Sequence, residues 1–152
     1  MSDKLDVVGI GNAMVDAIIP SNQSEIEKHE INRDSMNLID ENLKNNLHES
    51  YSIREMAGGG SLGNSMFGIT SFGGNGSFIG KIKNDEIGVY LQKDMIREGL
   101  KFPLGFTSPD ISTGCCTIFV EEDGTRTMCT FLGAGTLIAV SYTHLTLPTR
   151  LL

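Results

Sequence analysis

The sequence predicts an α/β fold with a parallel core sheet and a smaller β-sheet attached to it. Apolar, strand-like runs alternate with amphipathic, helix-like segments, which is the order typical of a parallel α/β core. Two β-rich segments joined by Asp123-Gly124 predict a hairpin, because this dipeptide favours the tight turn between antiparallel strands. Glycine accounts for 18 of 152 residues and is clustered, which indicates tight backbone turns near a ligand.

The first third of the chain predicts one buried strand, a short strand and two helices. Residues 5–10 are a short apolar run that leads into Gly9-Ile10-Gly11, as expected for a buried strand of a parallel sheet followed by a tight turn. The segment Ser24-Glu25-Ile26-Glu27 fits a capping box, which predicts that a helix starts there. Residues 35–39 are compatible with a short strand, and Asp40 precedes leucines at helical spacing.

The middle of the chain predicts a glycine turn, two helices and a second core strand. Residues 57–60 form the turn, and apolar side chains at helical spacing follow it until Gly73-Gly74. Residues 77–80 are the strand candidate. Asp85 can cap the next helix, which Gly99 would end.

The last third predicts the hairpin and then a segment of foreign origin. Residues 113–120 and 125–131 are rich in β-forming residues and flank the turn dipeptide. Residues 140–149 resemble a translated transposase-adapter sequence from DNA library preparation. We therefore expect the native domain to cover residues 1–139 and residues 140–152 to be an adapter-derived tail.

Charge and composition exclude several classes of function. A net charge of −7 disfavours nucleic-acid binding, which needs a basic face. The chain shows neither a signal-peptide pattern nor an apolar stretch of membrane-spanning length. Its three cysteines include no Cys-x-x-Cys pair, so we expect reduced thiols, no metal site and a cytoplasmic location.

The first candidate site motif follows the first strand. Asn12 and Asp16 offer an amide and a carboxylate near a strand end, a combination that suits a ligand with several hydroxyl groups. The alternative is a strand-ending turn with a solvated aspartate. A dinucleotide fingerprint, and with it an oxidoreductase, is disfavoured because Met14 stands at the third glycine position.

The second candidate motif is the glycine cluster before a predicted helix. Gly59 and Gly60 would expose backbone N–H groups at the helix N-terminus, and Asn64 falls one turn inside that helix. No Lys-Ser/Thr pair follows, so the cluster is not a Walker A loop. The alternative is a plain loop without a ligand.

Taken in order, these motifs resemble the ribokinase-like, or PfkB, kinase family. The resemblance runs through residues 59–64, Gly73-Gly74, Gly80 and the Asp85 segment to residues 123–127, and it covers about residues 6–135. The start of the chain, with Asn12 and Asp16, is most similar to adenosine-kinase-type members. The resemblance implies a ribokinase-like parallel sheet core with a small β-sheet lid, truncated relative to the family.

The resemblance also implies roles for individual residues. Binding of the substrate hydroxyls would fall to Asn12, Asp16, Gly59, Gly60 and Asn64. The lid side of the pocket would be formed by Cys116, Met128 and Leu132. Arg126 would approach the transferred phosphate, where a cation stabilises the transition state.

The resemblance implies an ATP- and Mg²⁺-dependent sugar or nucleoside kinase as the parent protein. The family's general base lies in a Gly-Ala-Gly-Asp-type motif, and this sequence contains only Gly133-Ala134-Gly135 without the aspartate. We therefore expect no catalytic residue here and an inactive fragment, with lid strands that can mediate a homodimer. The alternative function is a non-catalytic nucleotide- or metabolite-binding module.

Overall fold

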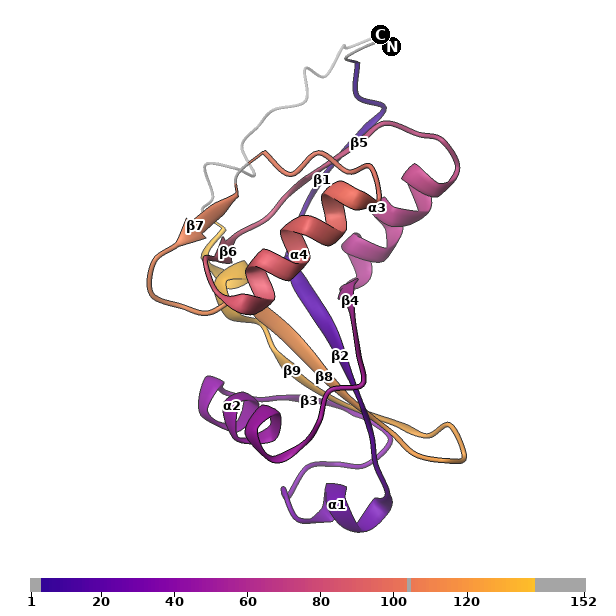
Figure 1. Ribbon diagram of the computed structural model, residues 1–152, viewed down its shortest axis with the longest axis vertical. Coiled ribbons are helices and arrows are strands. Elements are labelled where there is room, and N and C mark those ends of the chain that lie inside the picture. The colour runs from indigo at the N-terminus through magenta and orange to yellow at the C-terminus, as the bar shows by residue number, and fades with distance from the viewer. Residues whose placement is uncertain (1–3, 104, 139–152) are drawn as a thin grey trace, which may run out of the picture.

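The core is built on two parallel strands and two helices. A computed structural model describes residues 4–103 and 105–138. Strand β1 (Val7–Ile10) pairs with β5 (Gly76–Ile79), and α3 (Ser61–Ser71) and α4 (Glu86–Arg97) lie beside this pair (Figure 1). Apolar side chains between these elements form the first hydrophobic cluster, which includes Val15, Met66, Phe78, Leu91 and Met95.

A five-stranded sheet extends away from this core. Its order is β3 (Met36–Leu38), β9 (Arg126–Phe131), β8 (Gly114–Val120), β2 (Met14–Pro20) and β4 (Glu55–Gly59). The hairpin predicted around Asp123-Gly124 is confirmed as β8 and β9, which pair antiparallel. Strands β2 and β4 belong to this sheet and not to the parallel sheet of β1 and β5, so within the described residues the five-stranded sheet is the larger of the two.

One face of the five-stranded sheet is covered and the other is open. Helices α1 (Gln23–Glu27) and α2 (Glu41–Ser50) cover one face, where Ile19, Phe119 and Cys129 form the second hydrophobic cluster (Figure 1). Side chains alternate between the faces of a strand, so the neighbouring residues lie on the opposite face. We call this opposite side of the sheet the open face.

Besides β2 and β4, three short elements were not predicted from the sequence. Strands β6 (Ile82–Lys83) and β7 (Phe106–Ser108) form a separate parallel pair, and a 3₁₀ turn, η1 (Gly133–Leu137), follows β9. The predicted glycine turn at residues 57–60 is also shorter than expected. Strand β4 continues to Gly59, and only Gly60 has a positive φ, of 79°.

Helix starts follow from local hydrogen bonds. The capping box of α1 is formed by Asn22 and Glu25 rather than by Ser24, which corrects the predicted start of this helix. Asn22 Oδ1 accepts from the Glu25 N–H at 3.2 Å, and the Glu25 carboxylate accepts from the Asn22 N–H at 3.0 Å. The predicted caps Asp40 and Asp85 are confirmed at α2 and α4.

Replacing Asp85 with alanine is expected to lower the free energy of unfolding by about 2 kcal/mol. Asp85 accepts from the Gly88 N–H at 2.7 Å and from the Thr113 N–H at 2.9 Å, so it both caps α4 and holds the start of β8. The matched control is Asp40→Ala, which removes one cap bond only and should cost about 1 kcal/mol. Urea unfolding of both variants checks this; equal losses would contradict the bridging role.

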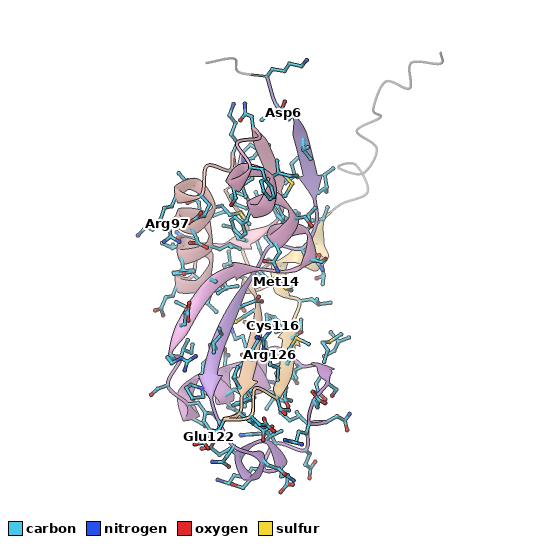
Figure 2. All side chains as sticks on the ribbon, turned by 90° about the vertical axis from the view of Figure 1, so that its right-hand side faces the viewer. Asp6, Met14, Arg97, Cys116, Glu122 and Arg126 are labelled. Atoms are coloured by element: carbon cyan, nitrogen blue, oxygen red, sulfur yellow. The ribbon has the colours of Figure 1, made fainter. Side chains whose placement is uncertain are left out.

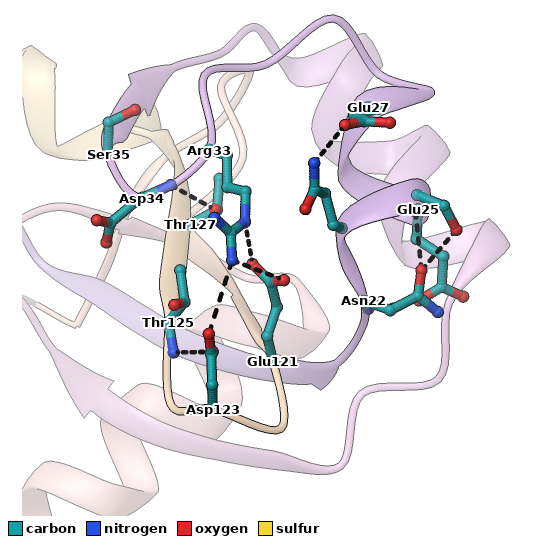
Figure 3. A network of polar contacts seen from close by, with 12 residues as sticks. Asn22, Glu25, Glu27, Arg33, Asp34, Ser35, Glu121, Asp123, Thr125 and Thr127 are labelled. Carbon is teal, nitrogen blue, oxygen red and sulfur yellow. Dashed lines mark hydrogen bonds and ion pairs between the residues drawn. The ribbon is translucent and has the colours of Figure 1, made fainter.

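The tip of the hairpin is tied to the loop after α1 (Figure 3). Arg33 donates to the Glu121 carboxylate at 2.8 and 3.1 Å and lies 3.8 Å from Asp123. The Asp34 N–H donates to Thr127 Oγ1 at 3.0 Å. These contacts join residues about ninety positions apart and fix β3 against β9.

Two predictions, the domain boundary at residue 139 and the adapter-derived tail, concern residues outside the described part of the chain. In the described part of the chain, no helix has both the length and the apolar character needed to cross a bilayer.

Candidate functional site

The carboxylate of Asp16 lies against the backbone of Gly59. Asp16 is on β2 and Gly59 is on β4, and the two strands pair antiparallel with Asp16 opposite Ala57. A Cβ at Gly59 would lie 2.2 Å from Oδ1 of Asp16 and 2.6 Å from Oδ2. The carboxylate therefore occupies the space that any side chain at position 59 would need.

The Asp16 side chain is half-buried and carries no internal partner. Among residues 4–103 and 105–138, its two oxygens make no hydrogen bond or ion pair with a protein group. Burial raises the pKa of the Asp16 carboxyl above its ordinary value. A desolvated acceptor without a donor is a natural place for a ligand that brings hydroxyl groups.

The other predicted binding residues gather around the same turn. Gly60 precedes α3, and a Cβ there would lie 3.6 Å from the carbonyl oxygen of Asn12. The Asn64 N–H donates to the Gly60 carbonyl at 2.9 Å, and the Asn64 side chain is exposed one turn inside the helix. Asp16 thus lies at Gly59, Asn12 lies near Gly60, and Asn64 follows Gly60 by one helical turn; a shared ligand for these residues stays a prediction.

The 3₁₀ turn η1 completes this end of the site, and the sequence analysis missed it. A Cβ at Gly135 would lie 3.0 Å from Cβ and 3.1 Å from Oδ1 of Asn12, so the turn packs directly on the asparagine. The sequence signal for this packing was Gly135, because a residue without a side chain permits such a close approach.

The open face of the five-stranded sheet continues from Asp16. Cys116 is opposite Asp16 on β8 and accepts from Thr130 Oγ1 at 3.3 Å. Burial raises the pKa of the Cys116 thiol, so this group is a neutral, small apolar contact and not a nucleophile. Beyond it the open face is apolar and includes Ile18, Ile118, Met128, Met36 and Leu38.

Strand β3 adds apolar surface that the sequence did not reveal as part of the site. Met36 and Leu38 are 56% and 67% exposed, although both are large apolar residues. Leu132 lies beside this edge, where it lines a cavity of about 270 Å³ together with Leu38 and Thr130. The predicted lid residues Cys116, Met128 and Leu132 therefore belong to one continuous surface.

A larger cavity of about 660 Å³ lies on the covered side, between α2 and the start of α4. None of the predicted site residues lines it. Its buried Lys44 bonds Ser112 Oγ at 3.3 Å, and its other side chains include both acids and bases. The half-buried carboxylate, which lacks a protein partner, and the open apolar face make the Asp16 side of the sheet the better candidate.

A model of the pfkB family carbohydrate kinases matches residues 5–140. The chain belongs to this family. Among the curated proteins, none matches the chain. The fold of this PfkB chain is α/β and ribokinase-like, as the resemblance predicted.

Solved structures agree with the family. Adenosine kinase from Sinorhizobium meliloti is 35% identical, with a TM-score of 0.80 over 91% of this chain and 42% of that one. A probable sugar kinase from Rhizobium etli is 31% identical, with a TM-score of 0.79 over 90% and 42%. Adenosine kinase from Schistosoma mansoni with 2-fluoroadenosine is 22% identical and shows the same fold, with a TM-score of 0.76 over 91% and 41%. The chain thus spans about 42% of the length of the first two structures.

Arg126, another predicted PfkB site residue, is the first residue of β9, next to the hairpin turn. It stands opposite Val120, four residues along β9 from Thr130, which is about 13 Å of strand. Figure 2 labels Met14, Cys116 and Arg126 in that order toward Glu122 of the hairpin. Its role at the transferred phosphate stays a prediction.

Proposed function

We propose that this PfkB chain is the substrate-binding N-terminal part of an ATP-dependent sugar or nucleoside kinase. The observation that carries the proposal is the half-buried, unpartnered carboxylate of Asp16 on the glycine turn, at the base of an open apolar face. The intact enzyme would transfer a phosphoryl group to a hydroxyl of the bound substrate. The fragment alone would bind the substrate without phosphorylating it.

The arrangement suits a ring with neighbouring hydroxyl groups. Two hydroxyls would each donate a hydrogen bond to one oxygen of Asp16, which restores the solvation that burial removed. The amide of Asn12 or Asn64 would pair with a further oxygen of the ring substituents. Gly59 and Gly60 leave the backbone uncovered, so that the ring can approach closely.

The open face favours a nucleoside over a free sugar. A sugar has no apolar group to place on Cys116 and Met128, whereas a purine or pyrimidine has a flat apolar face that suits them. Adenosine is therefore our first candidate, with ribose or another sugar next. The similarity to the Sinorhizobium meliloti adenosine kinase supports the same choice.

ATP and Mg²⁺ would be needed for phosphoryl transfer, and we propose that other parts of the enzyme bind them. Within the described residues no cluster of three or more histidine, cysteine or acidic side chains is arranged to hold a metal ion. The Mg²⁺ ion would neutralise charge on the transferred phosphate. The residues of this chain would hold and orient the acceptor hydroxyl.

Titration calorimetry of adenosine and of ribose into the chain tests the binding proposal. We expect adenosine to bind and ribose to bind at least about tenfold more weakly, since the apolar face contributes only for the nucleoside. Phosphorylation should appear only with the protein encoded by the reading frame that continues past codon 139. A genuine stop codon there would instead favour a non-catalytic binding module.

The affinity for adenosine is expected to fall at acidic pH. The ionised form of Asp16 accepts the hydroxyl hydrogen bonds, and its raised pKa means that protonation begins at a higher pH than for a solvated aspartate. Dissociation constants measured from about pH 8 to about pH 4 should therefore rise before the ordinary aspartate range is reached. A flat profile down to about pH 4 would exclude Asp16 as the anionic anchor.

Two accompanying proposals concern assembly and location. The exposed edge strand β3, with Met36 and Leu38, supports a homodimer through the lid strands, which light scattering can test. The three cysteines are unpaired and buried, which supports the cytoplasm, where thiols stay reduced.

A further inference from the structure

The outer edge of β4 is bonded by two side chains of α4. Among the described strands, β4 pairs only with β2 and is therefore an edge strand. The Tyr90 hydroxyl donates to the Met56 carbonyl, and the Gly58 N–H donates to Oδ2 of Asp94 at 2.8 Å. Residues two apart in a strand direct their peptide groups to the same edge. Helix α4 thus satisfies peptide groups that no neighbouring strand reaches.

Asp94 uses both carboxylate oxygens for this purpose. It is 5% exposed, and a buried carboxylate is costly unless it is paired and hydrogen-bonded. Oδ2 accepts from Gly58, and Oδ1 accepts from the guanidinium of Arg97, which lies one turn further along α4 at the outer side of the molecule (Figure 2). The two hydrogen bonds therefore fix the carboxylate against the strand.

The hydrogen bond to Asp94 is made by Gly58, the residue directly before the substrate site. Gly58 is followed by Gly59, whose backbone contacts the carboxylate of Asp16. Gly58 itself is enclosed, because a Cβ there would lie 2.6 Å from the Phe67 ring and 3.0 Å from Oδ2 of Asp94. Helix α4 thus holds β4 at one edge, and Gly59 of the same strand supports Asp16.

We propose that Asp94 is a positioning residue of the substrate site. Its carboxylate holds the Gly58-Gly59 backbone in the place where Gly59 supports the Asp16 side chain. Helix α4 belongs to the core and β4 belongs to the five-stranded sheet. This contact therefore also fixes the five-stranded sheet relative to the core at the site. The link to substrate affinity rests on the function proposed above, whereas the link to the Asp16 environment does not.

Two substitutions separate the hydrogen bond from the charge. Asp94→Asn and Asp94→Ala remove the same negative charge, but only asparagine keeps an oxygen that can accept from Gly58. The matched control is Asp6→Ala, which removes a bond of the same kind, from the Asn75 N–H to Asp6 Oδ2 at 2.9 Å, at the far end of the core. Because both Asp94 variants lose the same charge, any difference between them reports the hydrogen bond to Gly58.

In the 152-residue chain, Asp94→Ala should raise the hydrogen-exchange rate of the Gly58 amide at least about tenfold, and Asp94→Asn by less than about threefold. The Asp16 carboxyl, followed by carbon-13 NMR, should titrate nearer its ordinary pKa in the alanine variant, because water reaches it when the strand moves away. The dissociation constant for adenosine should rise about tenfold in Asp94→Ala and stay within about twofold in Asp6→Ala.

Three results would overturn the proposal. They are equal exchange rates at Gly58 in the two Asp94 variants, identical titration of Asp16 in both, and unchanged adenosine affinity in an alanine variant whose Gly58 amide has become exposed. If the wild-type chain binds neither adenosine nor ribose, the proposed function fails, but the exchange and titration measurements still decide whether Asp94 positions Asp16.

Discussion

Replacing Asp16 with asparagine is expected to weaken adenosine binding about 100-fold, equivalent to about 2.7 kcal/mol. The carboxylate can accept a hydrogen bond on each oxygen, whereas asparagine keeps one acceptor and presents an NH₂ group where a second hydroxyl must donate. Titration calorimetry at neutral pH measures the change. Affinity within about threefold of the wild type would remove Asp16 from the site.

The same substitution should stabilise the unliganded chain at neutral pH. The pKa of Asp16 is raised in the folded state, so ionisation costs more there than in the unfolded chain. This cost is present above the raised pKa and disappears as the pH falls through it toward the unfolded value. The stability difference between variant and wild type should therefore shrink in acid, which urea unfolding at several pH values can show.

The matched control for Asp16 is Asp110→Asn. Asp110 is exposed, and the bond it makes in the described structure uses its carbonyl oxygen, which accepts from Lys83 at 3.0 Å. Its amide variant should keep adenosine affinity and change the free energy of unfolding by less than about 0.5 kcal/mol. Stabilisation of both variants by the same amount would point to net charge rather than to the buried site.

Replacing Gly59 with alanine is expected to abolish measurable substrate binding and to lower the free energy of unfolding by about 3 kcal/mol. The added Cβ would lie 2.2 Å from Oδ1 and 2.3 Å from Cγ of Asp16, so either the carboxylate or the strand must move. The backbone of Gly59 has no positive φ, and therefore the effect is steric rather than conformational. Calorimetry and urea unfolding measure the two consequences.

Two further variants test that explanation. A Cβ at Gly63, in the first turn of α3, would meet nothing within 4 Å, so Gly63→Ala should stabilise the chain by about 0.5 kcal/mol. Combining Gly59→Ala with Asp16→Ala removes the clash, so the double variant should be more stable than Gly59→Ala alone. Additive effects of the two substitutions would show that the carboxylate and the glycine do not touch.

Several features of the fold could be predicted because their causes are local. Asp40 and Asp85 were identified as helix caps because a cap is made within three residues of the chain. The hairpin was predictable from Asp123-Gly124, and Gly124 has the positive φ of 86° that such a turn needs. The wrong prediction that the capping box of α1 starts at Ser24 also has a local cause, because Asn22, two residues earlier, forms the box with Glu25.

Other features depended on which segments meet. The clustered glycines were interpreted as turns near a ligand, yet a Cβ at Gly11 would lie 2.7 Å from Leu62, so this glycine permits α3 to pack on the end of β1. Met36 and Leu38 lie in the segment that was predicted only as a short strand, residues 35–39. Their exposure follows from the position of β3 at the edge of a five-stranded sheet, which no local pattern encodes.

The sequence by itself determined the residue types of the site and their order along the chain, together with the turns and helix starts that local hydrogen bonds decide. Only the tertiary structure decided that Asp16 lies against Gly59, that η1 packs on Asn12 and that Asp94 holds Gly58. The physical reason is that these contacts join residues 36 to more than 120 positions apart or cross between strands. Their energies depend on strand register and close packing, which arise only when the whole sheet has formed.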